Sequence, residues 1–448
     1  MIKDPSRLAW TVLIVSLIAF CITSTAIFLG VRWFLFDSTM PMNVTLSVGR
    51  GTVGVRAGTG DAAEEVERAT RILSRDDRLT TDSSSQGYIT FTDPYSHEVI
   101  ASLTLHRDST IVLGDASRPR FDFSSGAYII TIADSQGQFD IDIFSNLNRG
   151  IRFDVQSALG LIRMGSRGNY LLTSQEDAFT VFNRSGEAVV INQDSQARSV
   201  PEGMQGSVGK DASDIVLEQP FEDILPDGGF DTINSANPSL STAWRCYTQT
   251  DDPNSPEGTY GREIINDRSV MHITRLEQPG KPANNHAETG CLQYLNTAHE
   301  GLPVTQYNYL ELRASMLIQY QSLSACGQAG SECPLMLVID YIDPFGQNLR
   351  WIHGFYARYD PAVGWPLRCA SCALDHERLN PNTWYTFTSG NLLQLLPETQ
   401  RPTAILDVHF YASGHEYDVL LSEVALLAGN TPGADGSLAG EDTADAAQ

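Results

Sequence analysis

The sequence is short of basic residues and of recognisable catalytic motifs. It has 30 Lys and Arg against 54 Asp and Glu over 448 residues, a formal net charge of −24. A nucleic-acid-binding protein needs a basic face that displaces counterions from phosphates, so this balance argues against that class of partner. The chain also has no His-Glu-x-x-His metal site and no Gly-x-Ser-x-Gly nucleophile turn. We therefore expect a protein that is not an enzyme.

Cysteine is missing between residues 22 and 245, although the chain has seven cysteines. Cys21 lies in an apolar run, and the other six are all downstream. An even number confined to one region suits an oxidising compartment, where disulfides persist. Among the 15 arrangements that six cysteines allow, we predict the local one: Cys246–Cys291, Cys326–Cys333 and Cys369–Cys372. The last four could instead form a four-thiolate zinc site, although only one pair has the C-x-x-C spacing of a zinc knuckle.

One long apolar run lies near the N-terminus. From Leu8 to Val31, 24 consecutive residues carry no charge, which exceeds the ~20 needed to span a bilayer. A cleaved secretory signal usually has an apolar region of only ~7–15 residues, followed by small residues. Here the run ends in Arg32 and Trp33, which are typical of the membrane interface. Residues 1–36 are therefore predicted to hold a short tail and a membrane-spanning helix, with a cleaved signal as the alternative.

The flanking charges give an orientation. Lys3 and Arg7 precede the apolar run, whereas Arg32 is soon opposed by Asp37. The positive-inside rule then predicts a cytoplasmic N-terminus. Together with the cysteine usage, this predicts a single-pass cell-membrane protein whose C-terminal bulk is extracytoplasmic.

The rest of the chain is predicted to be mainly β. Residues 37–212 contain short alternating runs separated by turn residues, as at 88–91 and 139–143. The exception is 61–73, where Val66, Ala69 and Ile72 recur at helical spacing and predict a short helix. Residues 213–221 are predicted to be a linker, and 222–428 a β-sandwich of roughly eight to ten strands. Residues 429–448 have no aromatic or basic residue and predict a disordered acidic tail.

Several motifs in 37–212 carry a resemblance. Leu73, Asp76-Asp77 and Thr80-Thr81 precede a serine-rich strand, and closing hairpins follow at 153–165, 179–190 and 201–203. This order resembles the FecR-like domain family of bacterial envelope regulators, and it implies a β-domain involved in envelope signalling. Signalling members engage a sigma factor through a substantial cytoplasmic segment. Only seven residues precede the apolar run here, so we expect no direct sigma-factor control from the cytoplasmic side unless a partner subunit supplies it.

The second region carries another resemblance. It opens with Leu225-Pro226-Asp227-Gly228-Gly229-Phe230-Asp231, soon reaches Trp244, and ends in the alternating run 418–426. These features resemble galactose-binding-like jelly rolls, which include many carbohydrate-binding modules. The resemblance implies a jelly roll that recognises a glycan or a protein partner.

An aromatic segment from 351 to 365 supplies the candidate ligand-binding residues. Sugar rings stack on aromatic rings through their C–H faces, and their hydroxyls need charged or amide partners alongside. We predict a glycan site made of Trp351, Tyr356, Arg358, Tyr359 and Trp365. The alternative is that these aromatics fill the sandwich core, as strand aromatics commonly do.

Two carboxylates suggest a structural cation. Asp231 and Glu423 lie in the predicted first and last strands, which are close together in a jelly roll, so they could hold a calcium ion. The alternative is that both are solvated surface acids. No other cofactor is expected. The sequence thus predicts a membrane-anchored, non-enzymatic protein that binds or senses a glycan or protein partner at the cell envelope. A glycan-processing enzyme and a structural envelope component are the alternatives.

Overall fold

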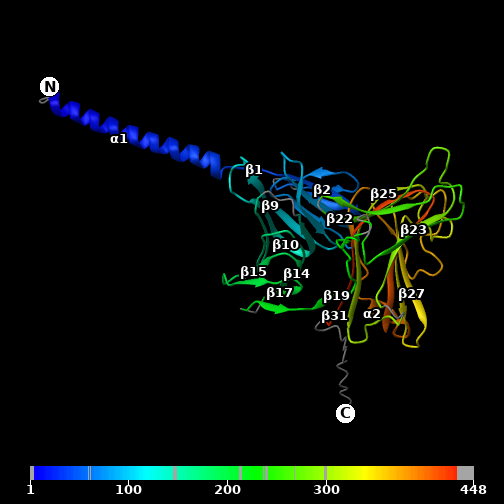
Figure 1. Ribbon diagram of the computed structural model, residues 1–448. Coiled ribbons are helices and arrows are strands. Elements are labelled where there is room, and N and C mark those ends of the chain that lie inside the picture. The colour runs from blue at the N-terminus through cyan, green and yellow to red at the C-terminus, as the bar shows by residue number, and fades with distance from the viewer. Residues whose placement is uncertain are drawn as a thin grey trace, which may run out of the picture.

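The protein consists of an N-terminal helix followed by two β-units that pack side by side (Figure 1). The computed structural model describes residues 5–58, 60, 62–144, 149–210, 214–235, 237, 241–266, 268–296 and 300–430. The chain is mainly β, as the sequence predicts. The acidic tail predicted for 429–448 lies outside the described residues from position 431 onward.

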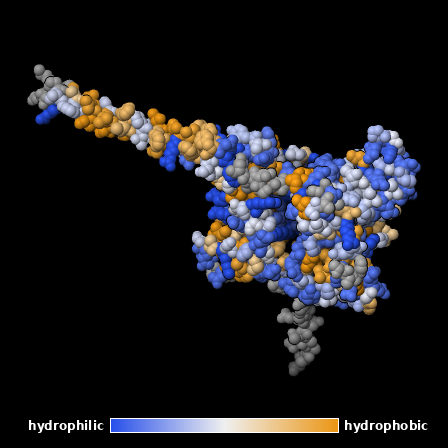
Figure 2. Space-filling view, in the orientation of Figure 1, coloured by the Kyte–Doolittle hydropathy of each residue, from blue (hydrophilic) through white to orange (hydrophobic). Residues whose placement is uncertain are grey.

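Helix α1 (Pro5–Arg32) continues into a π-helical turn η1 (Trp33–Asp37) and projects away from both β-units (Figure 1). The segment from Ser6 to Asp37 is apolar and long enough to cross a membrane. Figure 2 shows apolar surface along this helix, in contrast to the largely hydrophilic β-units. An uncharged run of this length forms a helix in lipid because a helix satisfies its own backbone hydrogen bonds.

An aromatic cluster joins the end of the helix to the first β-unit. The ring of Phe34 lies 5.4 Å from that of Phe121, and the ring of Phe36 lies 5.7 Å from that of Phe123. The Ser124 hydroxyl donates to the Phe36 carbonyl at 2.6 Å. Exposed aromatic rings at the end of an apolar helix match the belt that forms at a membrane interface.

The first unit is a closed β-network with a single core. Its core runs from Met42 to Ile215 in sequence. Strand β10 belongs to both halves of the network, since its first half pairs with β9 and β11 and its second half with β8 and β13. The strands are β1 (Thr39–Pro41), β2 (Asn43–Arg50), β3 (Val53–Arg56), β4 (Ala63–Val66), β5 (Arg71–Ile72), β6 (Arg78–Thr81), β7 (Gln86–Thr92), β8 (Val99–Leu105), β9 (Thr110–Pro119), β10 (Tyr128–Ile143), β11 (Ile151–Ser157), β12 (Gly160–Met164), β13 (Gly168–Ser174), β14 (Ala178–Ser185), β15 (Ala188–Asn192), β16 (Ala197–Val200), β17 (Met204–Gly209) and β18 (Val216–Glu218).

The helix predicted for 61–73 is wrong. Its residues form β4, which pairs with β3, and β5, which pairs with β2. Val66 and Leu73 are buried in the core, whereas Ile72 is 78% exposed. Burial therefore does not follow the helical spacing, and pairing with two neighbouring strands overrides the local pattern.

The second unit is a β-sandwich, as predicted, and its core runs from Leu225 to Ala428. One sheet has the order β21-β22-β31-β25-β29, with β19 beside β31; the other has the order β20-β23-β30-β26-β27-β28, with β24 beside β30. The elements are β19 (Phe221–Asp223), β20 (Arg245–Thr250), β21 (Thr259–Ile265), β22 (Arg268–Arg275), β23 (Ala287–Tyr294), β24 (Leu302–Pro303), β25 (Tyr309–Gln321), β26 (Leu335–Ile342), β27 (Asn348–Tyr356), β28 (Glu377–Arg378), β29 (Tyr385–Thr388), α2 (Leu392–Leu395), η2 (Glu398–Gln400), β30 (Ala404–Gly414) and β31 (Tyr417–Gly429).

The segment predicted as a linker is paired at both ends. Strand β18 pairs with β17 of the first unit, and β19, which starts at Phe221, pairs with β31 of the second. The rings of Phe221 and Phe182 lie 6.0 Å apart across the junction. The connection between the units is therefore anchored to both of them.

Polar contacts join the second unit, at β28, β29 and the segment between them, to the first unit. Gln86 donates to the Thr386 carbonyl at 2.8 Å and accepts from the Thr386 N–H at 2.7 Å. Arg50 forms an ion pair with Glu377 at 2.6 Å. Asn380 donates to the Val48 carbonyl at 2.9 Å. Such directional contacts fix one relative position of the two units.

His272 in β22 makes the stability of the second unit depend on pH. Its ring nitrogens lie 2.8 Å from Asp418 and 2.8 Å from Glu263. The hydrogen bond to Asp418, opposed by partial burial and helped by Glu263, raises the pKa of His272 to about 9. Since the unfolded pKa is ~6.5, this contribution is fully present below pH ~6.5 and is lost as the pH rises through about 9.

We expect the free energy of unfolding to fall by about 1–2 kcal/mol between about pH 6.5 and pH 9.5, after allowance for solvent screening at this partly exposed site. Urea unfolding of the full chain at both values measures the change. The variant His272→Gln should flatten this dependence. An equal fall in the variant and the wild type would show that the ion pair contributes nothing.

Candidate functional site

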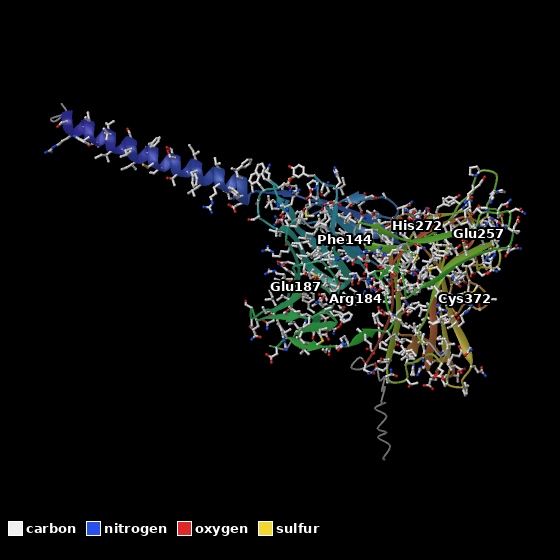
Figure 3. The ribbon with its side chains drawn as sticks, in the orientation of Figure 1. Phe144, Arg184, Glu187, Glu257, His272 and Cys372 are labelled. Carbon is white, nitrogen blue, oxygen red and sulfur yellow. A yellow bond between two sulfur atoms is a disulfide. The ribbon has the colours of Figure 1, made fainter. Side chains whose placement is uncertain are left out.

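Two short disulfides hold loops over part of the sheet that faces away from the first unit. The structure contains Cys246–Cys291, Cys326–Cys333 and Cys369–Cys372, the local pairing expected from the sequence. The last two pack with Met336, Val338 and Ile352 in a small separate core. Figure 3 shows Cys372 on the side of the sandwich away from the first unit. The loops thus cover one end of this outer sheet face, and the half-buried Tyr411 packs against them.

The buried disulfide identifies which residues point outward. Cys291 is fully buried in the sandwich core, with its partner Cys246 beside it. Because side chains alternate along a strand, the residues on either side of Cys246 point to the opposite, outer face. Residues that are directly paired on neighbouring strands point to the same face, so the register extends this assignment across the sheet. It defines the open face: Arg245, Tyr247, Glu288, Tyr294, Asp340, Arg350, Asp407, His409 and Tyr411.

Strand register sets these side chains in rows across the open face. Asp407 pairs with Tyr294 on one side and with Asp340 on the other, and Asp340 pairs with Arg350. Tyr247 pairs with Gly290, and Gly290 pairs with Tyr411. Rows lie ~7 Å apart along a strand, so the aromatic and charged side chains are within reach of one small ligand.

The two tyrosines flank a position that has no side chain. A Cβ on Gly290 would lie 2.5 Å from Cβ of Tyr411, so only glycine allows this approach. Gly290 itself is buried, whereas Tyr247 and Tyr411 are half-buried. Tyr411 also packs against the small disulfide core, and both rings remain partly exposed. This arrangement is suited to stacking against the apolar face of a sugar ring.

The charged groups of the open face are held in place by one another. Arg350 donates to both oxygens of Asp340, each at 2.7 Å, and the Asp407 carboxylate lies 3.2 Å from Nδ1 of His409. Tyr247 donates its hydroxyl to Glu288 at 2.7 Å. Burial raises the pKa of Tyr411 to about 12, and nearby Glu288 acts in the same direction. These groups offer fixed donors and acceptors for hydroxyls.

The predicted aromatic segment is divided between core and surface. Trp351 lies in the sandwich core and Tyr356 in the small disulfide core, with exposed fractions of 7% and 4%. They are therefore not available as stacking surfaces, which corrects the prediction at these two positions. Arg358 donates to the Ser322 carbonyl, Tyr359 is exposed beside Arg378, and Trp365 is half-buried. The last three share the loop that carries Cys369 and Cys372.

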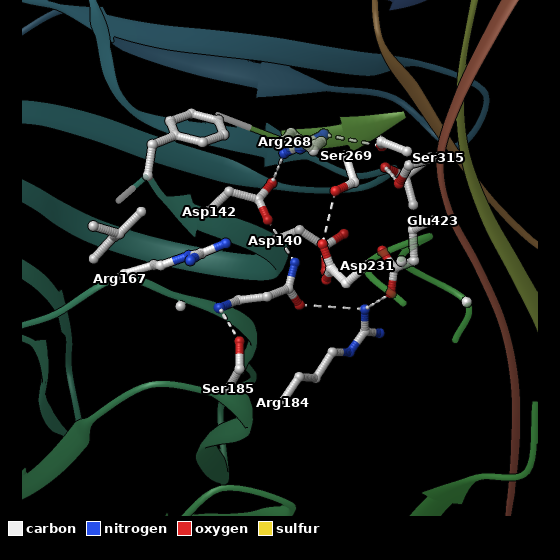
Figure 4. A pocket seen from close by; sticks show the side chains of 18 of the residues that line it. Asp140, Asp142, Arg167, Arg184, Ser185, Asp231, Arg268, Ser269, Ser315 and Glu423 are labelled. Carbon is white, nitrogen blue, oxygen red and sulfur yellow. Dashed lines mark hydrogen bonds and ion pairs between the residues drawn. The ribbon is translucent and has the colours of Figure 1, made fainter. Parts of the chain in front are cut away.

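The predicted calcium ligands lie at the other sheet. Asp231 and Glu423 both line a cavity between the two units (Figure 4). Glu423 forms an ion pair with Arg184 at 2.8 Å, and Asp231 accepts from the Ser269 hydroxyl at 2.7 Å. A calcium site needs several free oxygen ligands, whereas arginines occupy those of Glu423. The residues present therefore do not fit a calcium ion.

The zinc alternative also does not fit, because all four sulfurs are in disulfides that lie against His376. His376 accepts from the Gly354 N–H at 2.9 Å and lies 2.8 Å from the Gly330 carbonyl. Both ring nitrogens of His376 thus have hydrogen-bond partners that hold the loops in place. Asp340, Asp407 and His409 bring three ligand atoms within 4.8 Å on the open face, but Arg350 already binds both oxygens of Asp340.

Sequence reasoning missed the three tyrosines of the open face, Tyr247, Tyr294 and Tyr411. The sequence signal that could have found them is the alternation of inward and outward side chains along a strand. If Cys246 points into the core, then Tyr247 must point out. In the same way Tyr411 follows Phe410, which is fully buried.

No family model and no curated protein sequence matches this chain. Among solved structures, it is similar to a candidate anti-sigma factor from Parabacteroides distasonis ATCC 8503, with 13% identity, a TM-score of 0.23, and coverage of 32% of this chain and 59% of that one. The chain therefore spans less than two thirds of that protein.

Two carbohydrate-binding modules are also similar. The family 11 module from Clostridium thermocellum has 9% identity and a TM-score of 0.24, with 46% of this chain and 94% of the module covered. The CBM22-1 xylan-binding domain from Paenibacillus barcinonensis has 8% identity and a TM-score of 0.24, with 47% and 94% covered. All three TM-scores are below 0.5.

Proposed function

We propose that this chain is a membrane-anchored, extracytoplasmic, non-enzymatic protein that binds a glycan on the open face of its sandwich. The observation that supports this most directly is the placement of Tyr247 and Tyr411 on either side of Gly290, with carboxylates and arginines in the neighbouring rows. Rings present apolar surface to a sugar ring, and charged groups bind its hydroxyls. Binding there provides sensing at the cell envelope.

The anchor and the compartment support the same proposal. Helix α1 supplies the span, and the aromatic rings of η1 and the 121–123 loop supply an interfacial belt. Three disulfides in the second unit suit an oxidising compartment. We place the N-terminus in the cytoplasm because Lys3 and Arg7 precede the span.

The geometry of the open face favours binding over hydrolysis. A glycoside hydrolase uses one carboxyl group as a general acid and a second as nucleophile or base. Both oxygens of Asp340 are bound by Arg350, and Asp407 is held beside His409. An arginine bound to both oxygens occupies the atoms that a nucleophile or base would use, so this pair is better placed to hold a hydroxyl than to attack a glycosidic bond.

We expect Tyr411→Ala to weaken glycan binding by about 1–2 kcal/mol, a roughly five- to thirtyfold rise in Kd, because it removes one stacking face. A glycan array probed with the full chain in detergent identifies the ligand, and calorimetric titration then measures the Kd. The matched control is Tyr95→Ala, which removes a 59% exposed tyrosine from the first unit and should leave the Kd unchanged.

Two results would contradict the proposed function. One is the absence of binding to any glycan by a chain with its three disulfides formed. The other is equal affinity of wild type and Tyr411→Ala for a glycan that does bind. In that second case the exposed rings of the 357–376 loop would be the next residues to test.

A further inference from the structure

The cavity lined by Asp231 and Glu423 lies between the two units, on the opposite side of the sandwich from the open face. Its volume is about 240 Å³. At ~30 Å³ per water, it has room for about eight water molecules or one small solute. Figure 4 shows side chains from both units entering it, among them Arg167 and Arg184 from the first and Asp231 and Glu423 from the second.

A β-bulge in β31 builds one wall of this cavity. Ser315 pairs with Glu423 and the next residue, Met316, pairs with Leu421, so Ser422 is an extra residue in the strand. A bulge changes the direction of neighbouring side chains and is common beside functional sites. Here both Ser422 and Glu423 line the cavity, although neighbours in a regular strand would point to opposite faces.

The cavity holds buried hydrogen-bond donors that lack an acceptor. Arg313 has a side chain only 1% exposed, yet its Nε and Nη1 have no hydrogen-bond partner. Nε and Nη2 of Arg184 are also buried and without a hydrogen bond. Buried polar groups are rarely left in this state unless a water, ion or ligand satisfies them. An oxyanion is the natural partner because a guanidinium binds carboxylates in a paired geometry.

The cavity also has charged groups of both signs that form no ion pair among the described residues: Arg167 and Asp231 are exposed, Asp231 accepts from the Ser269 hydroxyl, and Asp223 accepts from two backbone N–H groups. The lining includes the acids Asp140, Asp142, Asp223, Asp231 and Glu423 and the bases Arg167, Arg184, Arg268 and Arg313. Arg268 forms an ion pair with Asp142, Arg184 with Glu423, and Arg313 with Asp140. Within the described part of the chain, no ion pair is left for Arg167, Asp223 or Asp231.

We propose that this cavity binds a free α-amino acid, a small solute that carries a carboxylate and an ammonium group. The carboxylate lies at the unused N–H groups of Arg184 and Arg167, and the ammonium lies at Asp231. An anion alone would add to a lining that already has five acids and four arginines. A cation alone would leave the buried arginine donors without an acceptor. A zwitterion supplies an acceptor for the unused donors of Arg184 and adds no net charge, and it bridges the two units.

The first test uses the full chain in detergent and each of the twenty common amino acids at about 10 mM. We expect at least one to raise the Tm by about 3 °C or more, since a ligand that binds only the folded state stabilises it. The N-acetyl and amide derivatives of that amino acid lack one charge each and should bind at least tenfold more weakly. No shift with any amino acid, or equal binding of either derivative, would overturn the proposal.

Two variants then test the assigned contacts. Arg167→Gln and Asp231→Asn leave the three ion pairs of the cavity intact and should each raise the Kd of the amino acid at least tenfold. The matched control is Arg75→Gln, which changes an arginine with a side chain 71% exposed away from the cavity. Unchanged affinity in both cavity variants would show that the amino acid binds elsewhere. Glycan binding on the open face does not enter these measurements, so the two proposals fail independently.

Discussion

Replacing Asp140 by leucine is expected to lower the free energy of unfolding by about 3–5 kcal/mol, because it removes the nearer of the two carboxylates that pair with a buried arginine. Asp140 in β10 is 3% exposed, and it pairs with Arg313 in β25, which is 1% exposed. His106 contacts the same carboxylate oxygen. Burial alone would raise the pKa of Asp140, but the charges of Arg313 and His106 hold it well below its usual value. The carboxylate is thus ionised throughout the physiological pH range.

This ion pair joins the two units, so its loss should also change how they unfold. Each unit has its own core, and Asp140 and Arg313 come from different ones. We expect urea unfolding of Asp140→Leu to separate into two transitions where the wild type shows one. Urea titration followed by circular dichroism and by tryptophan fluorescence measures both effects, because the first unit has no tryptophan and the four tryptophans that follow η1 are all in the second unit.

Two controls define the outcome. The double variant Asp140→Leu/Arg313→Met removes both charges and should recover most of the lost stability, since a buried pair replaced by apolar residues is often neutral. Glu64→Ala breaks an ion pair with Arg71 in which Glu64 is 70% exposed, and should cost less than ~1 kcal/mol. If Asp140→Leu costs no more than Glu64→Ala, the buried pair does not hold the units together.

The features that could be predicted from the sequence are those set by local patterns. An uncharged run of helical length gave α1, and strict alternation gave strands such as the second half of β10. Short spacings gave the disulfides of Cys326–Cys333 and Cys369–Cys372. The helix predicted over 61–73 shows the limit of this reasoning. Val66 and Leu73 are buried by pairing of β4 and β5 with strands up to some twenty-five residues away, which no local spacing reveals.

The candidate site was harder to predict because it depends on which face of each strand is buried. Trp351 and Tyr411 are both strand aromatics, but Trp351 points into the sandwich and Tyr411 points out. A shift of one residue exchanges the two faces, so composition alone cannot separate them. The cavity between the units could not be predicted from the sequence for a further reason. Arg184 and Arg313 are 129 positions apart and are brought to one place only by the packing of the two units.

Removal of the Cys246–Cys291 disulfide is expected to lower the free energy of unfolding by about 4 kcal/mol and to weaken glycan binding as well. The bond closes a loop with a sequence separation of 45, and chain-entropy estimates for a loop of that length give about this value. It joins β20 to β23, and among the described residues β20 is an edge strand whose one partner is β23. Since β20 carries Arg245 and Tyr247, a loosened edge would remove part of the open face.

The Cys369–Cys372 disulfide provides a matched comparison. Cys369–Cys372 has a sequence separation of only 3, so the same reasoning gives about 2 kcal/mol. The variants Cys246→Ala/Cys291→Ala and Cys369→Ala/Cys372→Ala each remove two sulfur atoms, and urea unfolding and glycan titration compare them directly. The first should lose about twice the stability and more of the affinity, because only its bond holds a strand of the open face. Equal losses of affinity would mean that the disulfide loop, and not β20, contacts the glycan.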